Sequence, residues 1–176
     1  MSHPGIKHIA LFGAGKSATV LIDYLKSVAD ENVWKVTVAD GNYEMAASKT
    51  GIHPLVKPVA LNIENAEERS SLIQEADLVI SMMPPHLHYL IADDCLQHGR
   101  HLLTASYLDD HIKKLSKQVA EKNVLFLCEM GLDPGIDHMS AMQMFEDIHA
   151  AGGTIHSFKS HCGGLIAPES DDNPWH

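Results

Sequence analysis

Short apolar runs alternate with segments that carry apolar residues every three or four positions along most of the chain. The first pattern is typical of buried strands and the second of amphipathic helices. Strands are expected at residues 6–12, 34–39, 56–61, 78–82, 101–105 and 124–127. Helices are expected near residues 16–28, 43–49, 65–75, 86–98 and 109–122. This alternation predicts an α/β fold in which helices flank a doubly wound parallel sheet.

A glycine-rich turn follows the first predicted strand, and Asp40 closes the second. The turn comprises Gly13, Ala14, Gly15, Lys16, Ser17 and Ala18. Gly13 permits a tight strand-to-helix turn, Gly15 allows backbone to approach a pyrophosphate, and the small Ala18 lets the helix pack on the strand. Backbone N–H groups at the start of the helix then face the phosphates. The pattern predicts a dinucleotide-binding domain of the Rossmann type.

Asp40 also bears on which dinucleotide binds. A carboxylate at the end of the second strand accepts hydrogen bonds from both ribose hydroxyls, and it repels the 2′-phosphate of NADP. No Lys or Arg lies between Lys35 and Lys49 to hold such a phosphate. NAD is therefore expected rather than NADP, although Asp40 and Gly41 are also common residues of a simple turn.

Composition fits a soluble protein of 176 residues with one domain and part of another, since 45% of the residues are apolar and 20% are charged. The formal charge of −10 argues against nucleic acid or an anionic membrane surface as partner. No long apolar run indicates a membrane span or a secretion signal, so a cytoplasmic location is expected. Cys95, Cys128 and Cys162 are widely spaced, which favours reduced thiols over disulfides or a structural zinc.

Residues 131–138, Gly-Leu-Asp-Pro-Gly-Ile-Asp-His, should lie where the nicotinamide end of the cofactor reaches. Asp137 and His138 are equally explained by a strand-to-helix connection in which Asp137 caps the next helix. Asp133 has no such simple role, and its carboxylate suits a base or a group that positions an amine. The helix at 139–148 carries a Met and Phe stripe, which we interpret as ordinary core packing.

Two further segments are distinctive: Thr-Ala-Ser-Tyr at 104–107 and His-Cys-Gly-Gly-Leu-Ile-Ala-Pro-Glu at 161–169. Together with residues 131–138 they resemble saccharopine dehydrogenase of the glutamate-forming type, also called saccharopine reductase. The resemblance covers residues 9–175. It implies NAD(P)-dependent oxidation of saccharopine to glutamate and 2-aminoadipate 6-semialdehyde, or the reverse reductive amination, in lysine metabolism.

The resemblance also implies site residues. It places cofactor contacts on the glycine-rich turn, on Asp40, and on Ser81, Met82, Met83, Leu132, Asp133 and Pro134. It implies substrate contacts from Ser106 and Tyr107. The implied acid and base groups are Tyr107, Asp133 and Cys162, which would shuttle protons as the imine forms and is hydrolysed. Many fungal relatives carry an arginine near the second strand end and use NADP, whereas Asp40 here favours NAD.

Similar sequences continue past Asn-Pro-x into a large sheet domain, whereas this sequence stops at His176. We expect a dinucleotide-binding domain at residues 1–130, and at 131–176 a linker with the first part of a truncated α+β substrate and dimerisation domain. Neither Arg69, expected on a solvated helix face, nor Arg100, expected at the sheet end away from the crevice, is suited to clamp the carboxylates of saccharopine. The chain alone is expected to bind dinucleotide but to turn over substrate poorly or not at all. Its exposed apolar surface favours a homodimer.

Other functions stay open. The chain could be a nucleotide-binding protein without catalysis, or an enzyme similar to carboxynorspermidine dehydrogenase that acts on another imino acid. The segments at 131–138 and 161–169 favour saccharopine over that substrate. A metal site that uses His86, His88, His98, His101, His161 and Cys162 is disfavoured, because the carboxylate and histidine spacing typical of zinc enzymes is missing.

Overall fold

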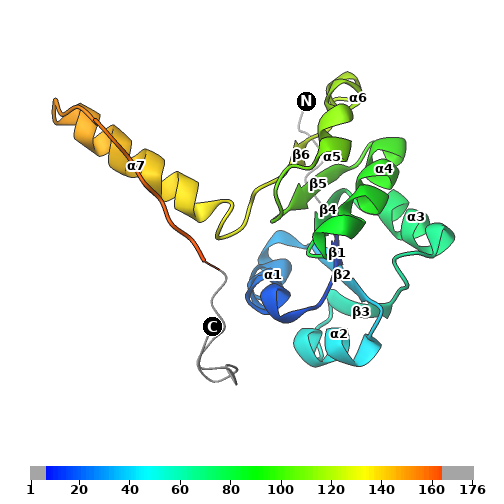
Figure 1. The fold of residues 1–176 in the computed structure, drawn as a ribbon. Helices are drawn as coiled ribbons and strands as arrows, with labels where there is room; N and C mark the ends of the chain where they lie inside the picture. The colour runs from blue at the N-terminus through cyan, green and yellow to red at the C-terminus, as the bar shows by residue number, and fades with distance from the viewer. Residues whose placement is uncertain (1–6, 164–176) are drawn as a thin grey trace, which may run out of the picture.

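The computed structural model describes residues 7–163 and shows a parallel sheet flanked by helices (Figure 1). The strands lie in the order β3-β2-β1-β4-β5-β6, and every neighbouring pair is parallel. They are β1 (His8–Phe12), β2 (Lys35–Asp40), β3 (Val56–Ala60), β4 (Leu78–Ser81), β5 (His101–Thr104) and β6 (Phe126–Leu127). This order is that of the Rossmann fold, so the predicted fold class is confirmed. Successive strands are added in one direction from β1 to β3 and in the opposite direction from β4 to β6, and such folds bind their ligands at the switch point between β1 and β4.

Helices follow the strands as the sequence predicts. They are η1 (Lys16–Ala18), α1 (Thr19–Asn32), α2 (Tyr43–Thr50), α3 (Ala66–Glu75), η2 (Pro85–Leu87), α4 (His88–His98), α5 (Asp110–Lys114), α6 (Ser116–Glu121) and α7 (Ile136–Ala150). The single helix predicted at 109–122 is wrong, because α5 and α6 are separate. Leu115 between them donates to the carbonyl of Ile112, and this tight three-residue turn interrupts the α-helical pattern. Among the described helices, none is both long enough and apolar enough to cross a membrane.

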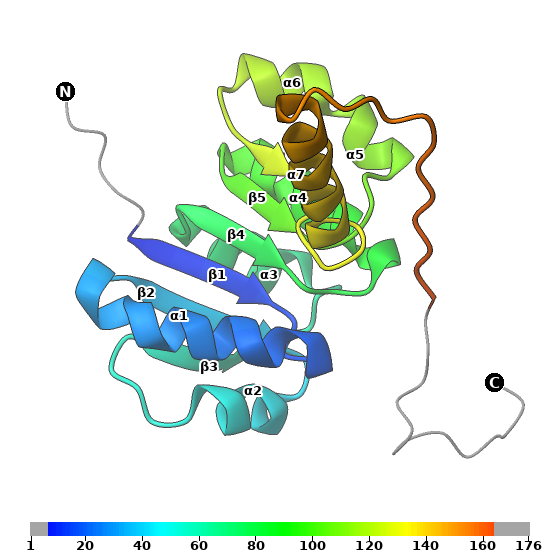
Figure 2. The ribbon, with the colours of Figure 1, turned by 90° about the vertical axis from the view of Figure 1, so that its left-hand side faces the viewer.

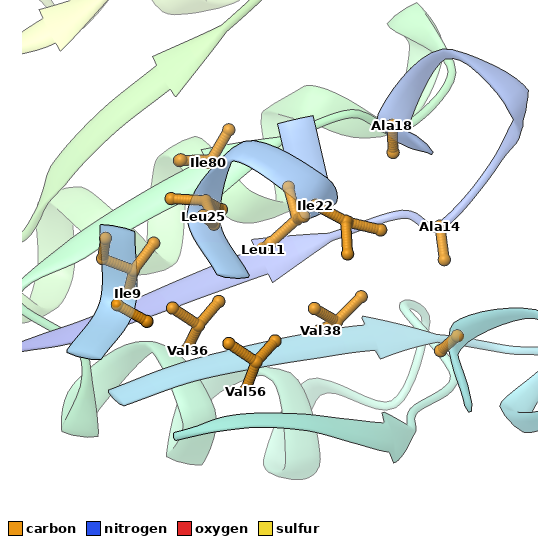
Figure 3. Packing of buried hydrophobic residues seen from close by; sticks show 12 residues of the cluster. Ile9, Leu11, Ala14, Ala18, Ile22, Leu25, Val36, Val38, Val56 and Ile80 are labelled. Atoms are coloured by element: carbon orange, nitrogen blue, oxygen red, sulfur yellow. The ribbon is translucent and has the colours of Figure 1, made fainter. Parts of the chain in front are cut away.

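The sheet is buried on both faces because side chains of β1 alternate between two apolar clusters. Ile9 and Leu11 point into the cluster that α1 and α2 cover, where they pack near Ile22 (Figure 3). Ala10 and Phe12 point into the cluster on the opposite face, under α3, α4 and α5. These layers fix the carboxyl ends of β1, β2, β4 and β5 at one edge of the sheet (Figure 2).

Helix α7 projects away from the sheet (Figure 1). None of its residues is buried, and Met139 and Met142 are both more than half exposed. The prediction that this stripe is ordinary core packing is therefore wrong for the described structure. Its aromatic contact within residues 7–163 is local: Phe145 packs edge-on against Phe158 in the segment that runs back along the helix, with ring centroids 4.9 Å apart.

Candidate dinucleotide and substrate site

The glycine-rich turn is held against the ends of three strands. The Gly13 N–H donates to the carbonyl of Ala39 at 2.8 Å, and the Ala14 N–H donates to the Asp40 carboxylate at 2.7 Å. Gly13 has a φ of 98°, and a Cβ there would lie 2.9 Å from the Met82 carbonyl oxygen after β4. Glycine is thus required at position 13 both by the backbone conformation and by this close approach.

Gly15 differs from Gly13, because a Cβ at position 15 would meet no atom within 4 Å. The space above this turn is therefore open, while η1 and α1 begin directly beyond it. The first N–H groups of a helix lack intrahelical partners and attract anions. These features fit the pyrophosphate of a dinucleotide.

Asp40 is fixed at the end of β2 by the backbone on both sides. Its second carboxylate oxygen accepts from the Asn42 N–H at 2.8 Å. Asp40 and Gly41 line a cavity of about 400 Å³, together with Met83 and Leu61. A carboxylate at the mouth of such a cavity can accept ribose hydroxyls with its remaining lone pairs.

Lys49 was not among the predicted site residues, yet its ammonium group donates to the carbonyl of Gly15. It lies in the last turn of α2, 34 residues along the chain from that glycine. A long cation beside the glycine-rich turn adds positive potential where phosphates are expected. Only the packing of α2 beside α1 brings it there, so the sequence alone carries no signal for it.

Tyr107 and Asp133 meet although 26 residues separate them. The Tyr107 hydroxyl donates to the Asp133 carboxylate at 2.8 Å, and Cys162 lies close enough for a hydrogen bond from its thiol to the same carboxylate. The bond to Asp133 raises the pKa of Tyr107 and of Cys162, since each loses a favourable contact on ionisation. Both groups are therefore protonated at neutral pH, and Asp133 is the acceptor of the set.

Two cavities share Asp133. One, of about 330 Å³, is lined by Pro85, Ala105, Ser106, Tyr107, Asp109, Asp133 and Pro134. The other, of about 810 Å³ and mostly apolar, is lined by Ser17, Val20, Leu21, Tyr24, Met82, Ala105, Met130, Gly131, Leu132, Asp133, Ile136 and Met139. The second cavity starts at the glycine-rich turn, so Asp133 stands between the expected place of the cofactor and the expected place of the substrate.

Ser81 is placed differently from the other predicted cofactor contacts. Its side chain is fully buried and lies 2.7 Å from the Nδ1 atom of His88. The other ring nitrogen of His88 lies 2.7 Å from the hydroxyl of Ser106 and 3.3 Å from that of Thr104. Burial lowers the pKa of His88, although Asp109 acts in the opposite direction, so the ring is neutral near pH 7. The sequence suggests His88 only as a disfavoured metal ligand and carries no signal for this bridge between two serines.

His98 and His101, two of the candidate metal ligands, are held by other partners. His98 is bonded to Ser70, and the Nδ1 atom of His101 accepts from the Leu125 N–H. Within residues 7–163 no group of three or more His, Cys, Asp or Glu side chains is arranged to hold an ion.

The turn at 131–135 leads into α7 and brings Gly131 into register with Gly135. Asp137 lies in the first turn of α7, where its carboxylate accepts from the Gly135 N–H at 2.9 Å and bonds His138. Burial would raise the Asp137 pKa, but these hydrogen bonds lower it overall, and the same carboxylate raises the pKa of His138. The N-cap of α7 is Gly135 and no described side chain caps it, so the prediction that Asp137 caps this helix is wrong, and Asp137 instead lies inside the first turn.

The expectation that Arg69 lies on a solvated face is wrong. Arg69 is 6% exposed and forms an ion pair with Asp94 of α4 at 2.8 Å, while it also donates to the carbonyl of Ile63. Arg100 precedes β5, at the end of the sheet away from the site, as expected. Neither arginine of the chain reaches the cavities beside Asp133.

The sheet order, the glycine-rich turn and Asp40 define a domain that binds a nicotinamide dinucleotide. Residues 9–127 match the family model described as the saccharopine dehydrogenase NADP binding domain, and residues 131–176 match that of the saccharopine dehydrogenase C-terminal domain. The chain belongs to the saccharopine dehydrogenase family.

Individual proteins that are similar to this chain support its membership of this family. The mitochondrial alpha-aminoadipic semialdehyde synthase of Bos taurus is 37% identical over 169 residues, which cover 96% of this chain and 18% of the relative. The saccharopine dehydrogenase [NADP(+), L-glutamate-forming] of Schizosaccharomyces pombe is 34% identical over 94% of this chain and 36% of its own length. The apo saccharopine dehydrogenase structure from Saccharomyces cerevisiae superposes with a TM-score of 0.80 at 32% identity, over 96% of this chain and 37% of that one. The chain thus covers 18% of the length of the cattle relative and 36% and 37% of the lengths of the two yeast proteins.

Proposed function

We propose that this chain binds the cofactor for NAD(P)-dependent oxidation of saccharopine to glutamate and 2-aminoadipate 6-semialdehyde, or for the reverse reaction. The observation that carries the proposal is the meeting of Tyr107, Asp133 and Cys162 at the sheet edge that also holds the glycine-rich turn. The names of the relatives support the same reaction. Division into a cofactor domain at 1–130 and a substrate and dimerisation segment at 131–176 is part of the proposal.

A bound nicotinamide would accept the hydride. The chain's own groups then manage protons: the Asp133 carboxylate accepts a proton from the secondary amine or from the water that adds to the imine. Tyr107 donates a hydrogen bond to that carboxylate and Cys162 lies near it, and either can return a proton to the leaving amine of glutamate. Ser106 lines the same cavity and is suited to hold a polar group of the substrate.

The proposal is tested by formation of NADH from NAD⁺, or of NADPH from NADP⁺, in the presence of saccharopine. Because neither arginine reaches the site, we expect the 176-residue chain to show little or no turnover by itself. Robust NADH production by the purified chain would contradict that expectation. In a longer parent protein, Asp133→Asn and Tyr107→Phe should lower kcat about 100-fold or more, as loss of a general acid or base does. Carboxynorspermidine in the same assay tests the competing substrate.

We further propose that NAD is preferred over NADP. Asp40 supports this, since its fixed carboxylate would repel a 2′-phosphate, whereas the family description and the fungal relatives carry NADP in their names. Fluorescence titration of the chain with NADH and NADPH should show at least about tenfold tighter binding of NADH. Asp40→Asn keeps an acceptor for the Ala14 N–H but removes the charge. The difference between the NADH and NADPH affinities should therefore become smaller. Equal binding of the two by the unchanged chain would instead point to Lys49 as a phosphate ligand.

We also propose that the chain forms a homodimer through α7. Met139, Met142 and Met144 are exposed on this helix, and such apolar surface favours association. Light scattering at high concentration should give a dimer mass, and a monomer mass would contradict the proposal. The expected cytoplasmic location stays a prediction, and the cattle relative is named as mitochondrial.

A further inference from the structure

His88 joins two serines that lie on neighbouring strands of the sheet. Ser81 ends β4, and Ser106 follows β5 at the mouth of the 330 Å³ cavity. The ring of His88, at the start of α4, lies behind both and is 2% exposed. Each serine hydroxyl is 2.7 Å from a ring nitrogen, which is a short distance for an uncharged pair.

A neutral imidazole has one nitrogen that donates and one that accepts. The directions of the two hydrogen bonds are therefore linked. If Ser81 donates to Nδ1, then Nε2 carries the ring proton and donates to Ser106. In that case the hydroxyl hydrogen of Ser106 stays free to point into the cavity. In the opposite tautomer, the Ser106 hydroxyl donates its hydrogen to His88 Nε2, and only its lone pairs can act as acceptors toward the cavity.

The burial of the two serines selects between these arrangements. Ser81 has no exposed surface, and within the described part of the chain its hydroxyl has His88 Nδ1 as its hydrogen-bond partner. A buried hydroxyl needs an acceptor for its hydrogen, so Ser81 donates to Nδ1. Ser106 lines the cavity and can direct its own hydrogen to a ligand. Thr104, which already accepts from the Ser106 N–H, lies 3.3 Å from Nε2 as a second acceptor.

We propose that His88 is a positioning residue that carries its proton on Nε2 and thereby holds the Ser106 hydroxyl as a free hydrogen-bond donor to the substrate. The donor suits an acceptor oxygen, and a carboxylate of an amino-acid substrate supplies one. The identity of that ligand rests on the proposed function, whereas the direction of the hydrogen bonds does not.

The direction is tested first, by the ¹⁵N chemical shifts and long-range ¹H–¹⁵N couplings of the His88 ring in the full chain at neutral pH. We expect a protonated Nε2 and an unprotonated Nδ1. Protonation on Nδ1, or on both nitrogens, would overturn the proposal whatever the chain binds. Loss of the signals in His88→Gln identifies them.

The consequence for the ligand is tested with a matched pair of variants. The amide of His88→Gln reaches the place of Nε2 and can still contact Ser106, whereas that of His88→Asn reaches only the place of Nδ1 and keeps Ser81. Saccharopine is titrated by calorimetry into each chain saturated with NADH, so that no oxidation occurs. His88→Asn should weaken saccharopine binding about tenfold, the usual effect of a lost hydrogen bond to a charged group, while His88→Gln stays close to the unchanged chain.

The controls separate positioning from simple support of the fold. Both variants should keep the NADH affinity within about twofold, and His98→Gln, which alters the Ser70 contact at the far end of α4, should change neither affinity. Equal loss in both His88 variants would show a purely structural role and overturn the proposal. If the unchanged chain binds no saccharopine, the distance of both arginines from the site accounts for it, the proposed substrate is then judged in the longer parent protein, and the ring tautomer alone decides the assignment of His88.

Discussion

Residues 8–127 and helix α7 are both rich in apolar side chains, but only the first region buries them. In the sheet region, Leu11 and Phe12 from one short strand point into separate closed clusters. On α7 the apolar residues repeat at helical spacing, yet none is buried. The spacing of apolar residues therefore predicts that one face of a helix is apolar. It does not predict which part of the molecule, or which other molecule, covers that face.

The two regions also differ in how far their ion pairs are buried. Arg69 and Asp94 form an ion pair between α3 and α4 that is nearly closed to solvent, whereas Asp137 and His138 pair at the exposed start of α7. Burial makes the first pair sensitive to the loss of either partner, while water screens the second. Ion pairs in the two regions thus contribute very differently to stability.

The largest expected effect is the loss of the buried ion pair. Asp94→Ala leaves the Arg69 guanidinium without its counter-ion and should lower the free energy of unfolding by about 3–5 kcal/mol. His138→Ala removes the exposed pair on α7 and should leave the free energy of unfolding nearly unchanged. Urea unfolding of both variants measures the difference. Equal effects would show that water reaches Arg69 in solution.

Truncation of a core side chain comes next. Leu11→Ala opens a cavity in a fully buried cluster and should cost about 2–5 kcal/mol in the free energy of unfolding. Met142→Ala on α7 is matched in chemistry but exposed, so in dilute solution, where the chain is monomeric, it should stay within about 0.5 kcal/mol. A large loss for Met142→Ala that depends on protein concentration would place this side chain in a dimer interface.

Substitutions at two glycines of the same turn should have different effects, one on the stability of the fold and the other on NADH binding. Gly13→Ala forces a positive φ on alanine and a contact with the Met82 carbonyl, so unfolding free energy should fall by about 1–3 kcal/mol. Gly15→Ala meets no atom of the chain and should unfold within about 0.5 kcal/mol of the unchanged protein, yet lose most of its NADH affinity. Denaturation and NADH titration of each variant check this. Normal NADH binding by Gly15→Ala would show that the pyrophosphate does not bind next to Gly15.

Local patterns predicted the strands, most helices and the glycine-rich turn, because each depends on residues close together in the sequence. Asp133 and Tyr107 could be selected from distinctive segments, and the structure brings them together. Arg69, Lys49 and His88 could not be placed in this way. Their partners lie on other elements, 25 residues away for Arg69 and 34 for Lys49, so their environment is set only by tertiary packing.

The smallest expected effect is on pH dependence, where the two regions have opposite signs. Burial is the main cause of the lowered pKa of both His8 and His88 in the sheet region, while the hydrogen bond to Asp137 raises the pKa of His138 on α7. Below about pH 6.5 the unfolded chain takes up protons that buried His8 and His88 do not, so the free energy of unfolding falls as pH falls. The contribution of His138 is present at low pH and is lost as pH rises through its raised value.

Because His138 is exposed, the buried pair should dominate, and the chain should be less stable at about pH 5.5 than at about pH 7.5. Urea unfolding at both values measures the sum, and NMR titration of the ring protons resolves each histidine. His8→Gln and His88→Gln should each flatten the pH dependence, because they remove a ring that must stay neutral. A chain that gains stability toward acid would show that the buried rings accept protons without penalty. In that case the neutral imidazole on which the Ser81 and Ser106 contacts depend would not be maintained by burial.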